Sequence, residues 1–213
     1  KDALKWRSLQ ANTFDTTREV LESWSFPAAK KLISPKPGGD YSMVIGANDW
    51  HIGECFDPSV GYSGNKFNSD IAARLIDSYS EKIKGAVEAR KYKFNSCYCV
   101  LNGDILNSAW DGKTVKGTQL HSDKINEDMF EAAFSSTVRF ISNLASIFPI
   151  VNVIIVPGNH DGPLLTILGT AIQAYFRLSP QIGIHNSKKW ADIFRIGNVA
   201  MLVTHGGAVR VKS

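Results

Sequence analysis

The sequence predicts an α/β domain whose central strands run parallel. Short runs of β-branched and apolar residues recur along the chain, and longer segments with apolar residues at helical spacing separate them. A polar cluster also follows several of these runs directly. Strands that alternate with helices favour a sheet of mostly parallel strands, so we expect a single α/β core.

The predicted elements begin after residue 40. The first helix has Asn68 or Ser69 as its cap and carries apolar residues on one side. Predicted strands span residues 41–47, 96–102, 151–156, 193–197 and 199–205, and predicted helices span residues 68–92, 126–148 and 163–178. The sequence contains no internal repeats and no low-complexity tracts.

Residues 1–40 differ from the rest of the chain. They contain a short helical pattern over residues 16–24 that Pro27 would interrupt, followed by the turn-rich segment SPKPGGD. We therefore interpret residues 1–40 as an N-terminal arm or interdomain linker and residues 41–213 as the domain.

Composition excludes several classes of protein. The chain has no apolar run long enough for a membrane span, and a cytoplasmic protein is expected. Three cysteines are too few for a disulfide framework, and Cys97 and Cys99 are expected to be buried thiols on one face of a strand. The net charge of +4 and the pI of about 8.9 suit a phosphate-bearing partner, but many proteins that bind no nucleic acid carry as much charge.

The polar clusters follow four predicted strands at the point where each strand ends. In chain order they are Asp49 and His51, then Asp104, then Asn159, His160 and Asp161, and finally His205. Loops at the carboxyl ends of parallel strands converge on one edge of the sheet, so residues distant in sequence are expected to meet there. Taken alone, each cluster is more simply a polar turn; their joint order favours a metal site.

The side chains in these clusters favour a particular chemistry. Carboxylates, imidazoles and an amide oxygen without thiolate suit Mn²⁺, Fe or Zn²⁺. Two such ions about 3.5 to 4 Å apart can hold the attacking and leaving oxygens of a displacement at phosphorus. We therefore expect two divalent ions, Mn²⁺ before Fe or Zn²⁺, and hydrolysis of phosphoesters. Glycines beside the clusters indicate sharp turns or close approach.

The clusters together resemble the first four motifs of the calcineurin-like metallophosphoesterase superfamily. The resemblance covers about residues 43–207 and rests on Asp49-Trp50-His51, Gly103-Asp104, Gly158-Asn159-His160-Asp161 and Thr204-His205-Gly206. It implies a β-sandwich between helical layers. It also implies that Asp49 and His51 hold one ion, that Asp104 bridges, that Asn159 and His205 hold the second ion, and that His160 is the general acid oriented by Asp161.

One departure concerns the superfamily's final Gly-His-x-His segment, which does not follow THGGAVRVKS in the printed sequence. The remainder of the domain is expected beyond Ser213, with a degenerate site as the alternative. The third motif reads Pro-Gly-Asn-His-Asp, which is closer to the DNA exonuclease and phage-type branch than to protein phosphatases. The expected partner is thus a nucleic acid or nucleotide phosphoester. Alternatives are a nucleotide or cyclic-nucleotide phosphodiesterase and a non-catalytic module of a larger assembly.

Further candidates lie in the insertion after Asp104. His121 could touch substrate, although a solvated histidine is the simpler interpretation, and Trp110 could stack on a base, although packing is the simpler one. Asn107 and Ser108 stand where many members of the superfamily carry a histidine, which weakens the transfer of substrate-loop roles. His185 is expected to be structural or exposed.

Overall fold

A computed structural model describes residues 39–57, 59, 66–108, 111–114 and 116–206. Its elements are β1 (Tyr41–Ala47), α2 (Ser69–Glu88), β2 (Phe94–Asn102), α3 (Asn126–Ile147), β3 (Ile150–Val156), α4 (Gly162–Phe176), β4 (Ile182–Asn186), β5 (Ala191–Ile196) and β6 (Val199–Thr204). The predicted α/β class is confirmed. The short helix expected over residues 16–24 lies outside the described residues, as does nearly all of the predicted arm.

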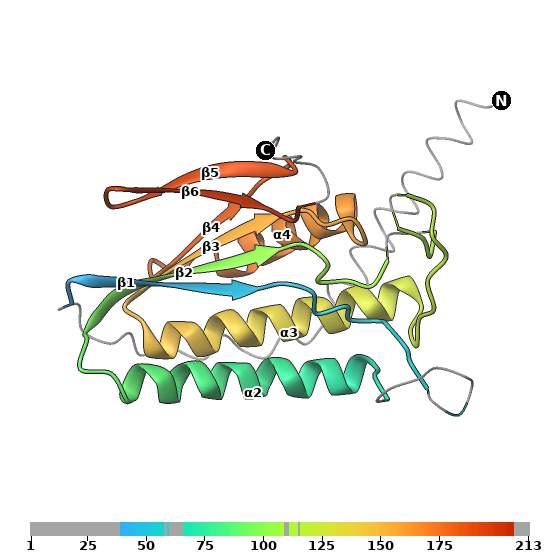
Figure 1. The fold of residues 1–213 in the computed structure, drawn as a ribbon, viewed down its shortest axis with the longest axis horizontal. Coiled ribbons are helices and arrows are strands. Elements are labelled where there is room, and N and C mark those ends of the chain that lie inside the picture. Colours follow the sequence, from blue (N-terminus) through green and yellow to red (C-terminus); the bar gives the residue numbers. More distant parts are fainter. Residues whose placement is uncertain (1–38, 58, 60–65, 109–110, 115, 207–213) are drawn as a thin grey trace, which may run out of the picture. The chain divides into compact units, whose positions relative to one another are not determined.

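Strands β1 to β4 form one parallel sheet in the order β1-β2-β3-β4. The register aligns their carboxyl ends, because Ala47 pairs with Leu101 and Asn102 pairs with Val156. The arrowheads of β1, β2 and β3 accordingly point the same way in Figure 1. This alignment brings the loops that follow the strands to one edge of the sheet.

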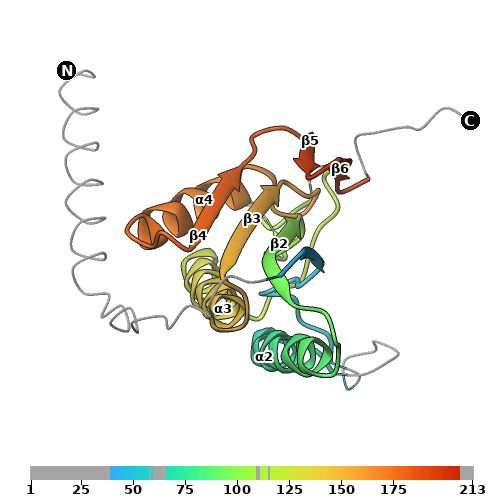
Figure 2. The same ribbon diagram turned by 90° about the vertical axis from the view of Figure 1, so that its left-hand side faces the viewer.

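The two faces of the sheet are covered by different elements. Helices α2, α3 and α4 lie on one face, and the antiparallel β5–β6 hairpin lies on the other (Figures 1 and 2). Val203 of the hairpin packs in one buried cluster with Val100, Ile154 and Val156 of the sheet. The alternation of side chains along β2 and β3 thus supplies two apolar faces, as expected for strands buried on both sides.

Local interactions explain where helix α2 begins and which side chains helix α3 buries. Helix α2 begins where the Asn68 side chain accepts a hydrogen bond from the Ile71 N–H at 2.9 Å, so the predicted cap is confirmed at Asn68. Its end at Glu88 lies four residues before the predicted end at residue 92. Helix α3 buries Met129, Phe140 and Ile141 completely, so its apolar face lies in the core.

Strand β4 was not predicted from the sequence. It is five residues long, and among the described strands it lies at the edge of the sheet and pairs with β3 alone. A short edge strand carries little periodic signal, and IGIHN contains both a glycine and polar residues. His185 is exposed in this strand, where its Nε2 lies 3.3 Å from Asp192 Oδ2.

Two further expectations concern the cysteines and membranes. Cys97 and Cys99 are both fully buried on the helix-covered face, as predicted, and Cys55 is partly buried. Within the described part of the chain, no helix combines the length and the apolar character that crossing a bilayer requires.

Candidate metal centre

The four polar clusters lie directly after strands β1, β2, β3 and β6, which end at Ala47, Asn102, Val156 and Thr204. The loops after β1 and β2 run side by side. The Asp49 N–H donates to the Gly103 carbonyl at 3.2 Å, and the His51 N–H donates to the Asp104 carbonyl at 3.0 Å. These bonds extend the pairing of the two strands past their ends and place both candidate ligand segments together.

Three candidate ligands have an unusual backbone. Asp49, His51 and Asp104 have φ values of 56°, 45° and 53°, and they are the only non-glycine residues of the described segments with positive φ. This left-handed conformation costs a residue with a Cβ free energy, and such residues concentrate at functional sites. The left-handed backbone thus coincides with three of the residues that the sequence motifs identify.

Glycines permit the loops after β2 and β3 to touch. A Cβ on Gly158 would lie 2.1 Å from Asp104 Oδ1 and 2.4 Å from the Asp104 nitrogen. A Cβ on Gly103, whose φ is 77°, would lie 2.5 Å from Gly158 Cα and 2.8 Å from His205 Nδ1. Only glycine at both positions lets Asp104 approach the third and fourth clusters this closely.

His205 brings its ring nitrogen Nε2 close to a side-chain oxygen of Asp104 and to one of Asn159. His205 Nε2 lies 3.0 Å from Asp104 Oδ2 and 3.0 Å from Asn159 Oδ1. The other ring nitrogen, Nδ1, lies 2.8 Å from the Asn102 carbonyl oxygen. A carbonyl oxygen can only accept, so Nδ1 carries a proton and donates it. Nε2 of the neutral ring is then a bare lone pair facing two oxygens.

The Nε2 lone pair and these two oxygens repel unless a positive charge lies between them, either a metal ion or a second proton on His205. Their spacing suits an ion, because ligands about 2.1 Å from an octahedral metal are about 3.0 Å apart. Ligand atoms of Asp49, Asp104 and His205 all lie within 4.8 Å of one another, so Asp49 belongs to the same cluster.

His51 lies beside this cluster. Its Nε2 is 3.9 Å from Asp49 Oδ1, and its ring meets the His160 ring edge-on with centroids 4.6 Å apart. Burial lowers the pKa of His51, against the opposing effect of Glu54 and the other nearby carboxylates. A lowered pKa keeps the ring neutral near pH 7, which is the form that can bind a metal.

His160 is held by the main chain. Its Nδ1 lies 2.7 Å from the carbonyl oxygen of Asn107 and therefore donates to it, while Nε2 lies 4.0 Å from Asp104 Oδ2. The His160 N–H donates to Asp104 Oδ1 at 2.9 Å. The His160 N–H thus positions the Asp104 carboxylate. Nε2 of the His160 ring lies on the side of the same carboxylate.

The prediction that Asp161 orients the His160 ring is wrong. Asp161 is fully buried, and its two carboxylate oxygens accept the main-chain N–H groups of Ile105, Leu106 and Gly158 at 2.7, 3.3 and 3.0 Å. Burial, aided by the charge of Asp104, raises the pKa of Asp161 to about 6. Asp161 therefore joins the two loops, and the Asn107 carbonyl orients the ring. A main-chain acceptor of this kind leaves no signal in a sequence.

The candidate substrate residues are less well defined. His121 is exposed, and its carbonyl accepts a hydrogen bond from the buried Asn107 side chain at 2.9 Å, so its loop is anchored beside His160. Trp110 lies outside the described residues. Loop residue Asp123 also accepts hydrogen bonds from the Ser69 N–H and hydroxyl at 2.8 and 2.7 Å, which ties the insertion to the start of α2.

Comparison with known proteins identifies no relative: no protein-family model, no curated protein and no solved structure matches the chain significantly. The geometry of the site therefore carries the functional argument alone. It offers a cluster of oxygen and imidazole ligands open to solvent at Asp49, which is about half exposed, and buried at Asp104. Oxygen and imidazole ligands of this kind suit a divalent cation.

Proposed function

We propose that this protein is a two-metal phosphoesterase that hydrolyses phosphodiester bonds, as a DNA exonuclease does. The same proposal gives it a metallophosphoesterase-type arrangement of layers. The approach of His205 Nε2 to oxygens of both Asp104 and Asn159 is the observation that carries the proposal. The left-handed backbone at Asp49, His51 and Asp104 supports it independently.

The side chains divide between two ion positions. Asp49 and His51 would hold one ion, and Asn159 and His205 would hold the other. Asp104 would be the ligand common to both ions, and the His160 N–H positions its carboxylate by donating to Oδ1. Bound divalent ions would supply a hydroxide near neutral pH and neutralise charge on the phosphate. The Asn102 carbonyl fixes the tautomer of His205 that leaves Nε2 free to bind.

His160 would act at the leaving oxygen. Its Nδ1 is committed to Asn107, so a proton on Nε2 is the only one that the ring can give to substrate. The ring cannot turn without losing this hydrogen bond, which orients it in advance of the reaction. Lys113, Lys116 and Lys124 in the loop after Asp104 provide positive charge for a phosphodiester backbone.

Metal content and turnover test the proposal together. We expect the chain to bind two Mn²⁺ or Zn²⁺ ions and to hydrolyse bis(4-nitrophenyl) phosphate. Asp104→Ala should lose both ions and all activity, whereas Asn159→Ala should mainly weaken one ion. Asp128→Ala, an exposed carboxylate in the first turn of α3, is the matched control and should change neither. Failure to bind metal, or equal metal loss in Asp104→Ala and Asp128→Ala, would refute the assignment.

A further inference from the structure

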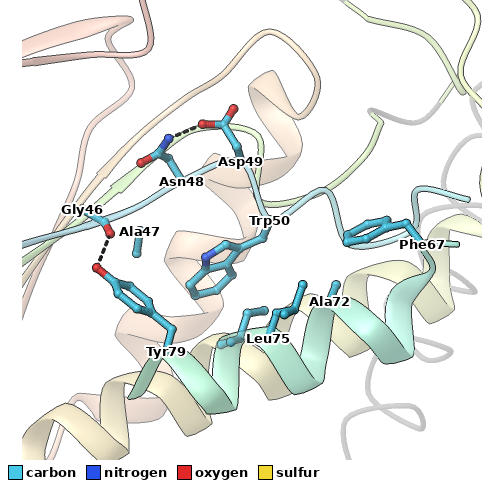
Figure 3. Close-up of a pocket in the computed structure, with 10 residues that line it drawn as sticks. Gly46, Ala47, Asn48, Asp49, Trp50, Phe67, Ala72, Leu75 and Tyr79 are labelled. Carbon is cyan, nitrogen blue, oxygen red and sulfur yellow. Dashed lines mark hydrogen bonds between the residues drawn. The ribbon is translucent and has the colours of Figure 1, made fainter. Parts of the chain in front are cut away.

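We infer that a cavity beside Asp49 binds an aromatic substituent of the phosphodiester. This substituent is the one that stays on the phosphate when the leaving group departs. This inference rests on the proposed function. The cavity has a volume of about 240 Å³ and lies between the end of β1 and the first turns of α2 (Figure 3). Asp49 lines it and also belongs to the metal cluster, so the two sites are continuous.

The lining of the cavity is apolar and aromatic. Trp50 forms its centre in Figure 3, with Leu75 and Ala72 of α2 below and Phe67 and Tyr79 to either side. The walls are rigid, because the Trp50 ring packs edge-on against Phe140 with centroids 5.3 Å apart and the Tyr79 hydroxyl donates to the Gly46 carbonyl at 3.0 Å. Preformed apolar walls with a polar rim are typical of small-molecule sites.

The dimensions select a flat ring system. An enclosed apolar cavity of about 150 Å³ is enough for benzene in another protein, so this cavity has room for one or two fused rings. Trp50 also brings an indole N–H, which can only donate, to the wall of the cavity. Asn48, which donates to the Asp49 carboxylate, places an amide at the rim. A nucleobase has this combination of flat apolar faces and polar edges.

The position of His160 decides which part of the substrate enters. His160 does not line the cavity; its ring is held by Asn107, in the loop after β2. A proton donor must lie at the leaving oxygen, so the leaving group would point toward His160. The attacking oxygen approaches opposite the leaving group, so the retained substituent occupies one of the remaining corners of the phosphate and would point past Asp49 into the cavity.

Kinetics with two diesters test this assignment. Methyl 4-nitrophenyl phosphate and phenyl 4-nitrophenyl phosphate share a leaving group and differ in the retained substituent. We expect kcat/KM to be roughly tenfold higher for the phenyl ester, as burial of one ring face would give. Leu75→Ala should remove most of this preference by lowering kcat/KM for the phenyl ester and not for the methyl ester. Leu75 is 58% exposed, so its replacement should not unfold the chain. Leu178→Ala, at an 83% exposed leucine remote from the cavity lining, is the matched control.

The outcomes separate the two proposals. Equal loss on both esters in Leu75→Ala would place the leaving group in the cavity and overturn the inference, as would no loss on either. Absence of turnover on both esters would instead count against the proposed function. In that case the cavity is tested by NMR on the metal-free chain, titrated with phenylphosphonate and separately with methylphosphonate. The chemical shift of the Trp50 indole N–H is followed, and Trp50→Phe assigns this signal. A shift with phenylphosphonate alone supports the inference, and no shift overturns it.

Discussion

Gly158→Ala should disturb the candidate metal centre without removing any ligand. The added methyl group would lie 2.4 Å from the Asp104 nitrogen and 2.1 Å from Asp104 Oδ1. Ordinary van der Waals contact needs about 3.4 Å, so the loop carrying Asp104 or the loop carrying Gly158 must move by about 1 Å. The Asp104 nitrogen is a backbone atom, which cannot turn aside as a flexible side chain could.

The expected magnitudes follow from this displacement. Overpacking against backbone destabilises a fold by about 1 to 3 kcal/mol. A shift of about 1 Å also breaks the convergence of Asp104 Oδ2 and His205 Nε2, which now lie 3.0 Å apart. Loss of ligand positioning weakens metal binding by roughly tenfold to a hundredfold. We therefore expect a modest loss of stability and a larger loss of metal affinity.

Urea unfolding of the metal-free chain and calorimetric titration with Mn²⁺ or Zn²⁺ measure the two effects separately. Gly85→Ala is the matched control, because a Cβ there meets nothing within 4 Å and Gly85 lies inside helix α2. This control should raise stability by about 0.5 to 1 kcal/mol and leave metal binding unchanged. If Gly158→Ala bound metal as tightly as the unaltered chain, close approach of the loops would not be what positions Asp104.

The remaining predictions concern the proton donor, its neighbour and the thiols. His160→Ala should retain its metal ions but lose roughly 10² to 10⁴ in turnover; the loss should be smaller for a 4-nitrophenyl leaving group, and loss of an ion would instead make His160 a ligand. Asp161→Asn should lower the free energy of unfolding by about 1 to 3 kcal/mol in urea, because one amide oxygen cannot serve three buried N–H groups; unchanged stability would contradict this. Burial raises the pKa of Cys97 and raises the pKa of Cys99 to about 12, so both should resist a thiol reagent at pH 8 until unfolding. Cys55, which is partly buried, should react first, and rapid labelling of all three would show that the core opens.

Much of the architecture was predictable because it rests on local patterns. The apolar runs of β1, β2 and β3 and the periodic faces of α2 and α3 have signals that persist over many residues. The order of the polar clusters after these strands also predicted that Asp49, Asp104 and His205 would meet. Strand β4 was missed because a short edge strand is stabilised mainly by its neighbour β3 rather than by its own sequence.

The sequence by itself determined the fold class and which residue types gather at the carboxyl edge of the sheet, because both follow from periodicity and chain order. Only the tertiary structure decided what holds them there. The hydrogen bonds from His160 to the Asn107 carbonyl and from His205 to the Asn102 carbonyl use main-chain atoms that every residue possesses. The role of Asp161 was likewise decided by burial, because its partners are amide groups of two loops separated by more than 50 residues. Contacts of this kind depend on the packing of the loops, so no pattern of residue types encodes them.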